Sequence, residues 1–442
     1  MPRSTLAVID EQGTAHDYGA LAEKAEKAAD AFRALGAGRF GFFQFGNRVE
    51  SLALYLGCLQ AGHVPLLLPE AIPPEQLDRL SSHYRPDWTL GPAGLVAAPV
   101  HEADRRPVPH PDLTLLLSTS GTTGSPRLVR LSAGALSANA ESIAGYLGLQ
   151  PGDRAMTTLP PSYSYGLSII HSHLAAGAAI VLNNHALVER AFWDAMVEHG
   201  ATSLAGVPQI YQVLERLHLE RMELPALRTL TQAGGHLEDR LVRFFDETAR
   251  RRGWRFFVMY GQTEAAPRMS YVPPERLADK IGSIGRAIPG GRLVLDPATG
   301  EIVYHGPNVM MGYAETRSDL ARGDELGGIL RTGDLGRQDD EGYFYIAGRI
   351  KRFIKLTGNR VSLDELEQSL KQSTAAPLAV SGADDLLRVW VEGSDYAVLA
   401  AVEASLRAQL GLHHSLYRIL RVDRLPLLPS GKTDYAALMS SS

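Results

Sequence analysis

The stretch Leu113-Thr-Leu-Leu-Leu-Ser-Thr-Ser-Gly-Thr-Thr-Gly-Ser-Pro-Arg127 joins an apolar strand directly to a loop rich in hydroxyls and glycines. Glycine lets the backbone bend where a side chain would clash, and serine and threonine hydroxyls donate hydrogen bonds to phosphate oxygens. The same composition also suits a solvated turn. The stretch therefore indicates either a phosphate-binding loop or an ordinary turn. The phosphate-binding interpretation involves Ser118, Thr119, Ser120, Gly121, Thr122, Thr123 and Gly124.

Four further motifs follow downstream: Tyr260-Gly-Gln-Thr-Glu264, Arg331-Thr-Gly-Asp334, Gly348-Arg-Ile-Lys-Arg-Phe-Ile-Lys-Leu-Thr-Gly358 and Pro429-Ser-Gly-Lys432. Together with the loop, they resemble the signatures of the adenylate-forming superfamily. That superfamily contains acyl- and aryl-CoA synthetases, firefly luciferases and the adenylation domains of nonribosomal peptide synthetases. Residues 47–69 resemble the family's early helix and strand, so the resemblance covers nearly the whole chain. Five motifs in family order make a chance agreement negligible.

The resemblance implies an α/β fold with two domains. Residues 1–350 would form a large ATP- and acyl-binding core of α/β layers with a small β-rich subdomain. Residues 351–442 would form a small, mobile α+β domain that carries the catalytic lysine and rotates between two half-reactions about a hinge at Lys351. The segment ahead of Ser118 is shorter than in typical members, which suggests that peripheral N-terminal elements are trimmed. The sequence does not specify an oligomeric state.

Periodicity predicts the first elements of the chain. Apolar residues at helical spacing predict an amphipathic helix over 17–35, which ends at Gly36. Residues 40–45 predict a strand, and Asn47 is the expected N-cap of a helix that reaches Gly62.

Strand and helix signals alternate to about residue 260, which implies largely parallel α/β layers. Residues 167–182 predict a helix, a glycine turn and a buried strand, because the apolar run is too short and too polar to span a membrane. From Ile281 short strands between glycines, such as 300–306, predict a β-rich subdomain.

Composition agrees with a cytoplasmic enzyme. A net charge of −5 and a pI near 6.3 give no electrostatic case for nucleic acid or anionic membranes. The single cysteine, Cys58, cannot form an internal disulfide and is expected to be a buried small hydrophobe in a reducing compartment. Residues 1–20 contain acidic side chains and no continuous apolar core, so they do not read as a signal peptide.

Lys432 matches the family's catalytic lysine, which would bridge the substrate carboxylate and the α-phosphate of ATP. Attack of a carboxylate on a phosphate brings two negative charges together, so the site must neutralise oxygens and hold the groups in line. The alternative is a solvated lysine in a C-terminal turn. Ser430-Gly-Lys-Thr433 also ends like a P-loop, but Pro426 stands where that motif needs its first glycine, which excludes a P-loop ATPase.

The resemblance also implies roles around ATP. Glu264 would hold Mg²⁺, which prefers hard carboxylate oxygens and keeps several waters. Thr263 would hydrogen-bond the α-phosphate; alternatively, Thr263 and Glu264 merely cap a helix. Asp334 would accept the ribose hydroxyls, and Arg349 would support ribose and phosphates. The remaining predicted ATP contacts are Tyr260 against the adenine, Gly234 and Gly235 in the adenine-side loop, Gly261 and Arg127.

Two departures from the family pattern are visible. Arg127 stands where lysine is common in the phosphate loop, so the positive charge is kept with a different geometry. We expect altered pyrophosphate handling rather than lost activity. Lys351-Arg352 stands at the hinge where many CoA synthetases carry aspartate, but lysine also occurs there in the family.

The substrate is indicated by Gly166, which stands where amino-acid-activating domains place an aspartate for the substrate's ammonium. A buried ammonium without a counter-charge is costly, so we expect an acyl or aryl acid without a free α-amine. An apolar acyl pocket is expected from Tyr163, Tyr165, Gly166, Val207 and Met259, although core packing would explain the same residues.

The predicted reaction has two steps: formation of acyl-AMP with release of pyrophosphate, and transfer to the thiol of CoA or of a carrier protein's phosphopantetheine arm. Lys355 and Gly358 would face the thiol tunnel. The alternatives are an enzyme that activates an amino acid, a ligase that stops at the adenylate or forms an amide or ester, and a non-catalytic binding protein. Retention of the lysine at 432 argues against the last, because binding alone does not need it.

Overall fold

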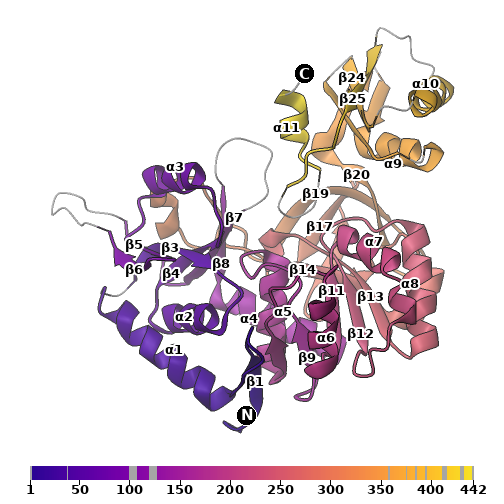
Figure 1. Ribbon diagram of the computed structural model, residues 1–442. Coiled ribbons are helices and arrows are strands. Elements are labelled where there is room, and N and C mark those ends of the chain that lie inside the picture. The colour runs from indigo at the N-terminus through magenta and orange to yellow at the C-terminus, as the bar shows by residue number, and fades with distance from the viewer. Residues whose placement is uncertain are drawn as a thin grey trace. The chain divides into compact units, whose positions relative to one another are not determined.

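Figure 1 shows the computed structural model of the chain. It describes residues 2–36, 38–98, 107–118, 127–356, 359–374, 376–383, 386–393, 396–410, 416–428 and 433–440. Within them the chain forms two compact units, which we call unit 1 (within 2–293 and 304–330) and unit 2 (294–303 and 331–440). In the described residues no helix combines the length and apolar character needed to cross a membrane. The functional boundary at Lys351 stays a prediction.

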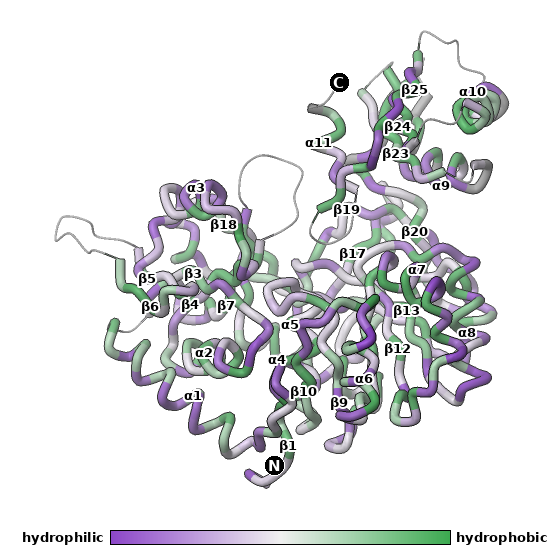
Figure 2. The backbone as a smooth tube through the Cα atoms, in the orientation of Figure 1, coloured by the Kyte–Doolittle hydropathy of each residue, from purple (hydrophilic) through white to green (hydrophobic). Residues whose placement is uncertain are grey.

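Unit 1 contains a seven-stranded sheet in the order β18-β8-β7-β4-β3-β5-β6. Strands β5, β3, β4 and β7 run parallel, while β6, β8 and β18 pair antiparallel at its two sides. Helix α1 packs against α2, and Figure 2 shows α1 alternating between hydrophilic and hydrophobic residues, as a helix with one buried face requires. The elements are α1 (Tyr18–Arg33), β3 (Phe40–Phe45), α2 (Val49–Gln60), β4 (Val64–Pro69), α3 (Pro74–Tyr84), β5 (Trp88–Gly91), β6 (Gly94–Ala97), β7 (Leu113–Ser118), β8 (Leu128–Ser132) and β18 (Gly312–Ala314).

The second sheet of unit 1 has nine strands in the order β15-β14-β13-β12-β11-β9-β10-β1-β2. Its centre, from β13 to β1, is parallel. Helix α4 contacts β7 and β8 of the first sheet, α5 contacts β9 and β10 of the second, and α4 packs against α5. The two helices therefore join the sheets. The elements are β1 (Leu6–Ile9), β2 (Ala15–Asp17), α4 (Ala133–Leu147), β9 (Arg154–Met156), α5 (Ser164–Ala176), β10 (Ala179–Val181), α6 (Arg190–Glu198), β11 (Ser203–Gly206), α7 (Pro208–Arg216), β12 (Thr229–Gln232), α8 (Asp239–Arg252), β13 (Arg255–Gly261), β14 (Arg268–Val272) and β15 (Arg286–Ala287).

Short strands dominate after β15, as expected. A four-stranded sheet has the order β16-β17-β19-β20, from β16 (Arg292–Leu295), β17 (Glu301–His305), β19 (Ile329–Gln338) and β20 (Phe344–Arg349). The rest of unit 2 packs two helices on a three-stranded sheet around a core that includes Leu370, Val389 and Leu406. Its elements are β21 (Phe353–Leu356), β22 (Asn359–Ser362), α9 (Leu363–Ser373), β23 (Leu378–Ala383), β24 (Leu386–Glu392), α10 (Tyr396–Leu410), β25 (Tyr417–Val422) and α11 (Tyr435–Ser440). Short 3₁₀ helices are η1 (Leu219–Arg221), η2 (Thr263–Ala265), η3 (Pro274–Asp279), η4 (Arg317–Ala321) and η5 (Ile350–Arg352).

One predicted cap is wrong. Arg48 is the N-cap of α2, and the Asn47 side chain instead donates to Thr157 Oγ1 at 2.9 Å and to the Asn183 carbonyl at 2.7 Å. Asn47 thus links the end of β3 to the second sheet, a role that local sequence does not reveal. The predicted burial of Cys58 is confirmed, and burial raises the pKa of its thiol.

Candidate active site

The Tyr260-Gly-Gln-Thr-Glu264 motif lies at the end of β13 and in η2, where the chain turns back into β14. Gly261 is required there, because a Cβ atom would lie 2.0 Å from the Pro267 carbonyl oxygen. The Gln262 N–H donates to the same oxygen at 2.9 Å. The turn therefore holds Thr263 and Glu264 close to the carboxyl end of a central parallel strand, where α/β folds commonly bind ligands.

Glu264 is held from two sides. The Tyr313 hydroxyl donates to Glu264 Oε1 at 2.8 Å, and the Met310 N–H donates to the Glu264 carbonyl at 2.8 Å. Burial, and then the Glu264 charge, raise the pKa of Tyr313, so it stays a neutral donor. The Arg127 guanidinium lies 3.8 Å from the centre of the Tyr313 ring, with Nε 3.2 Å from Glu315 Oε1. The structure thus connects the arginine of the phosphate loop to the predicted metal ligand through Tyr313, which sequence reasoning missed.

Thr263 faces the start of α5. Its hydroxyl lies 3.1 Å from the hydroxyl of Ser164, the first residue of that helix. Two hydroxyls side by side at a helix N-terminus suit contact with an anionic oxygen.

The predicted adenine-side loop packs against the predicted acyl pocket. Gly234 has φ +85°, and a Cβ there would lie 2.8 Å from the Tyr163 hydroxyl and 2.9 Å from Val207 Cγ1. The Gly235 carbonyl accepts from Gln232 Nε2 at 2.9 Å. A side chain at position 234 would therefore displace Tyr163, so glycine is needed both for the backbone and for the close approach.

Four of the five predicted acyl-pocket residues share one hydrophobic cluster: Tyr163, Tyr165, Val207 and Met259. The Tyr165 hydroxyl donates to the Thr231 carbonyl at 3.0 Å, and the Tyr146 hydroxyl donates to the Met259 sulfur at 3.0 Å.

Gly166 is buried on α5, where a Cβ would lie 2.2 Å from the Pro160 carbonyl oxygen. Close packing alone thus requires glycine at this position, and its place in the substrate pocket stays a prediction.

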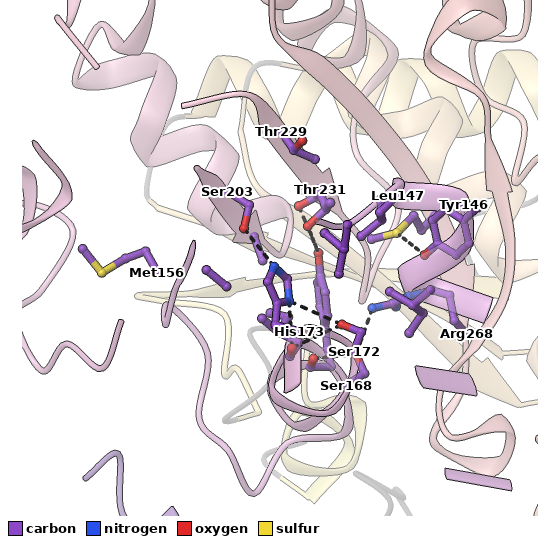
Figure 3. Close-up of a pocket in the computed structure, with 17 residues that line it drawn as sticks. Tyr146, Leu147, Met156, Ser168, Ser172, His173, Ser203, Thr229, Thr231 and Arg268 are labelled. Carbon is purple, nitrogen blue, oxygen red and sulfur yellow. Dashed lines mark hydrogen bonds between the residues drawn. The ribbon is translucent and has the colours of Figure 1, made fainter. Parts of the chain in front are cut away.

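A small cavity of about 20 Å³ lies between α4, α5 and β13, with Tyr165 and Met259 in its wall. Arg268, the first residue of β14, also lines it, as Figure 3 shows. Arg268 is 3% exposed. An apolar pocket was expected here, so this buried cation is the main feature that sequence reasoning missed. Its only sequence signal is an arginine four residues after Glu264.

Asp334 and Arg349 come together in unit 2 as a cross-strand pair of β19 and β20. Arg349 Nε donates to Asp334 Oδ1 at 2.9 Å, and Asp334 is 1% exposed while Arg349 is exposed. The pair joins the two residues that the resemblance assigns to the ribose.

Several predicted site residues lie outside the described residues: Thr119, Ser120, Gly121, Thr122, Thr123, Gly124, Gly358 and Lys432. The backbone of Lys351 lies in η5 and that of Lys355 in β21, and their side chains are not described. The roles of these residues stay predictions.

Comparison with known proteins identifies the family. A family model described as AMP-binding enzyme matches residues 2–314. The chain belongs to this family. It is 36% identical over 296 residues to the indoleacetate–CoA ligase of Aromatoleum aromaticum, a match that covers 64% of this chain and 56% of that relative. It is 29% identical to the sulfoacetate–CoA ligase of Cupriavidus necator, over 99% of this chain and 95% of the relative.

Solved structures confirm the predicted fold class. The o-succinylbenzoate CoA synthetase (MenE) of Bacillus subtilis, in complex with its acyl-adenylate intermediate, superposes with a TM-score of 0.81. That match has 22% identity and covers 99% of this chain and 96% of the other. The same synthetase has been solved with ATP and a magnesium ion. The AMP-binding enzyme family and the ligase class of its members agree with the enzyme class expected from the five motifs.

Proposed function

We propose that this protein is an AMP-forming acid–thiol ligase that activates a small carboxylic acid with ATP and transfers the acyl group to a thiol. The observation that carries the proposal is the turn between β13 and β14. It presents Thr263 next to Ser164, which lies between the cluster residues Tyr163 and Tyr165, and it carries Glu264 at the next position. Membership of the AMP-binding enzyme family supports the same reaction.

Magnesium fits the donor set at Glu264. The described residues hold no cluster of three histidine, cysteine or acidic side chains, so Glu264 offers a single carboxylate. Mg²⁺ is commonly bound by one or two carboxylates together with substrate phosphates and water. The bound ion would neutralise phosphate charge, while Tyr313 holds the carboxylate in place through its hydroxyl.

The reaction balances as two substitutions. A carboxylate oxygen of the acid attacks the α-phosphorus of ATP, and pyrophosphate leaves with the electrons of the broken P–O bond. The thiol sulfur then attacks the acyl carbon and loses its proton to water, and AMP leaves with the electrons of the broken acyl C–O bond. In the first step Lys432 would stabilise the charge that develops between the carboxylate and the α-phosphate, and the Thr263 hydroxyl would donate to an α-phosphate oxygen.

The acid has no free α-amine in this proposal. The cavity beside Tyr165 and Met259 is lined by an arginine and by no acidic side chain among the described residues. An ammonium buried there would meet a like charge and no counter-charge.

The acceptor is CoA in this proposal, as the names of the relatives suggest. A carrier protein's phosphopantetheine arm offers the same thiol. We place the reaction in the cytoplasm, where the lone buried Cys58 would stay reduced.

Pyrophosphate release tests the proposal. The protein is incubated with ATP, Mg²⁺ and a panel of acyl, aryl and α-amino acids, with CoA, with a carrier protein in its phosphopantetheinyl form, or with neither. We expect release with acids that lack an α-amine, and a thioester only when a thiol is present. Release without any thioester would favour an adenylate-only or amide-forming ligase, and absence of release with every acid would overturn the proposal.

Lys432→Ala should lower pyrophosphate release by at least about 10²-fold while ATP binding survives, because the lysine acts mainly on the transition state. Lys24→Ala is the matched control, because the Lys24 side chain is a partly exposed lysine of α1. A loss below about tenfold would remove Lys432 from the catalytic role.

A further inference from the structure

Arg268 is one of three arginines in the described residues whose exposure is below one tenth. The other two have carboxylate partners: Arg130 pairs with Glu325, and Arg317 Nη2 lies 2.8 Å from Asp87 Oδ2. Arg268 forms no ion pair with any described residue, and its Nε is buried without a hydrogen-bond partner. Burying an uncompensated cation is costly, so such a group calls for an explanation.

Neutral groups surround the Arg268 guanidinium. It lies 4.3 Å from the centre of the Tyr165 ring. Its Nη2 donates to Ser168 Oγ at 3.3 Å, and Figure 3 draws this hydrogen bond between the two labelled residues. Burial raises the pKa values of Tyr146, Tyr163 and Tyr165, and the nearby Arg268 charge opposes the rise in each. The phenols therefore stay neutral and orient the guanidinium without cancelling its charge.

The backbone of Arg268 is fixed from two directions. Its carbonyl accepts from Asn139 Nδ2 at 2.9 Å and from Asn308 Nδ2 at 2.8 Å, and both asparagines are 1% exposed. A cation held this firmly at a cavity wall is preorganised for an anion.

Helix α5 contacts both Arg268 and Thr263, the residue expected to bind the α-phosphate. Ser164 contacts Thr263, and Ser168, four residues later, contacts Arg268. Four residues of α-helix rise about 6 Å. A short acid could therefore present its reacting carboxylate near Thr263 and its far end near Arg268.

We propose that Arg268 is a specificity-determining residue that binds a second anionic group, a carboxylate or a sulfonate, at the far end of a short acid substrate. This inference rests on the proposed function. The cavity has room for about one water molecule, so the anionic group enters only when a lining side chain moves. Met259, which is unbranched and flexible, is the side chain that moves.

The test compares acids that differ only at the far end. Pyrophosphate release is measured with succinate, glutarate and adipate, with butanoate, pentanoate and hexanoate, and with 3-sulfopropanoate. We expect kcat/KM of the wild type to favour the best diacid over its matched monoacid by at least about tenfold. The sulfonate distinguishes recognition of charge from recognition of carboxylate shape.

Arg268→Met should lower kcat/KM for the diacid by about 10²-fold and change that for the monoacid by less than about threefold. Arg268→Lys keeps the charge without the planar fork and should lose only about tenfold on the diacid. The matched control is Arg255→Met, because Arg255 also lies over a ring and donates to a threonine hydroxyl but is exposed. It should leave both substrates within about twofold.

A wild type that prefers monoacids overturns this inference but leaves the proposed function standing. Equal losses on both substrates in Arg268→Met overturn it as well, because a purely structural arginine would act on both. If Arg268→Met does not fold, the test uses Arg268→Lys and the ratio of kcat/KM for the diacid to kcat/KM for the monoacid. A ratio equal to that of the wild type overturns the inference. Absence of pyrophosphate release with every acid overturns the proposed function and this inference together.

Discussion

Arg268 in unit 1 and Arg352 in unit 2 differ in the groups that surround their positive charges. Arg352 Nη1 lies 2.9 Å from Asp364 Oδ1, and Nη2 lies 3.2 Å from Glu367 Oε2. Its guanidinium also lies 3.9 Å from the centre of the Tyr435 ring. Arg268 is more deeply buried, yet its contacts within the described residues are phenol and serine groups. Within these residues, carboxylates compensate the charge of Arg352 but not that of Arg268.

The difference separates a structural charge from one that suits a ligand. Arg352 joins η5 to α9 and, through Tyr435, to α11, so its carboxylates are already in place when the chain folds. Arg268 is held in place with no counter-charge from the described part of the chain, which suits an anion that binds and leaves. Four predictions follow from this contrast, in order of decreasing effect.

Arg352→Met should destabilise unit 2 by about 3 kcal/mol, because it removes one of the two cations that compensate the buried Glu367 carboxylate. This loss of stability is small for a broken buried ion pair, because Lys371 Nζ still lies 2.7 Å from Glu367 Oε1. Urea unfolding and hydrogen exchange of the α9 amides measure the effect. Arg418→Met, at an exposed position of β25, is the control, and a loss below about 1 kcal/mol for Arg352→Met would contradict the prediction.

Glu367→Gln should cost about 2 kcal/mol at neutral pH, within the range for hydrogen bonds to a charged group. Burial alone would raise the pKa of Glu367, but the charges of Lys371 and Arg352 and the hydrogen bonds from Lys371 and the Val380 N–H outweigh it and lower the pKa. Because the pKa of Glu367 is lower in the folded than in the unfolded protein, its ionised form stabilises the fold at pH values above the ordinary glutamate pKa of about 4.3. This stabilisation is lost as the pH falls through the pKa of the folded state.

The stability difference between wild type and Glu367→Gln should therefore be constant from about pH 8 to 5 and shrink below. Urea unfolding at several pH values measures it. Glu403→Gln, whose side chain is 43% exposed beside Arg407, should change stability by less than about 0.5 kcal/mol. A difference that grows on acidification would show that the carboxyl is protonated in the fold.

Lys351→Pro tests the hinge directly beside the anchored Arg352. Proline restricts φ, so we expect acyl-AMP formation to persist while thioester formation slows by about tenfold, or the reverse if the other state is trapped. Single-turnover measurements of each half-reaction distinguish these outcomes. Equal slowing of both would count against a hinge at this position.

Arg268→Met should have the smallest effect on stability, within about 1 kcal/mol, because it removes a charge without leaving a buried carboxylate unpaired. Urea unfolding measures it against Arg352→Met. A loss as large as that of Arg352→Met would show that Arg268 is structurally compensated, which would remove the contrast.

Much of the fold could be predicted because its signals are local. Apolar spacing predicted the helix at 17–35, found as α1 (Tyr18–Arg33), and the strand at 40–45, found as β3. The segment 167–182 divides as expected into α5, a turn at Gly177 and β10. Asn47 was misread, because its partners Thr157 and Asn183 lie more than a hundred residues away.

The candidate site likewise has features that the local sequence predicted and features that depend on distant residues. By themselves, the motifs in order indicated the family, the reaction type and the residues around ATP, because each motif encodes its own turn and its own donors. Tertiary structure alone decided that Tyr313 holds Glu264. It also decided that Arg268 lies beside Tyr165 and Ser168, with no carboxylate partner among the residues that the structure describes. The physical reason is that the cost of a buried charge depends on its neighbours in space, and the neighbours Tyr165 and Ser168 lie on α5, about one hundred residues before Arg268 in the sequence.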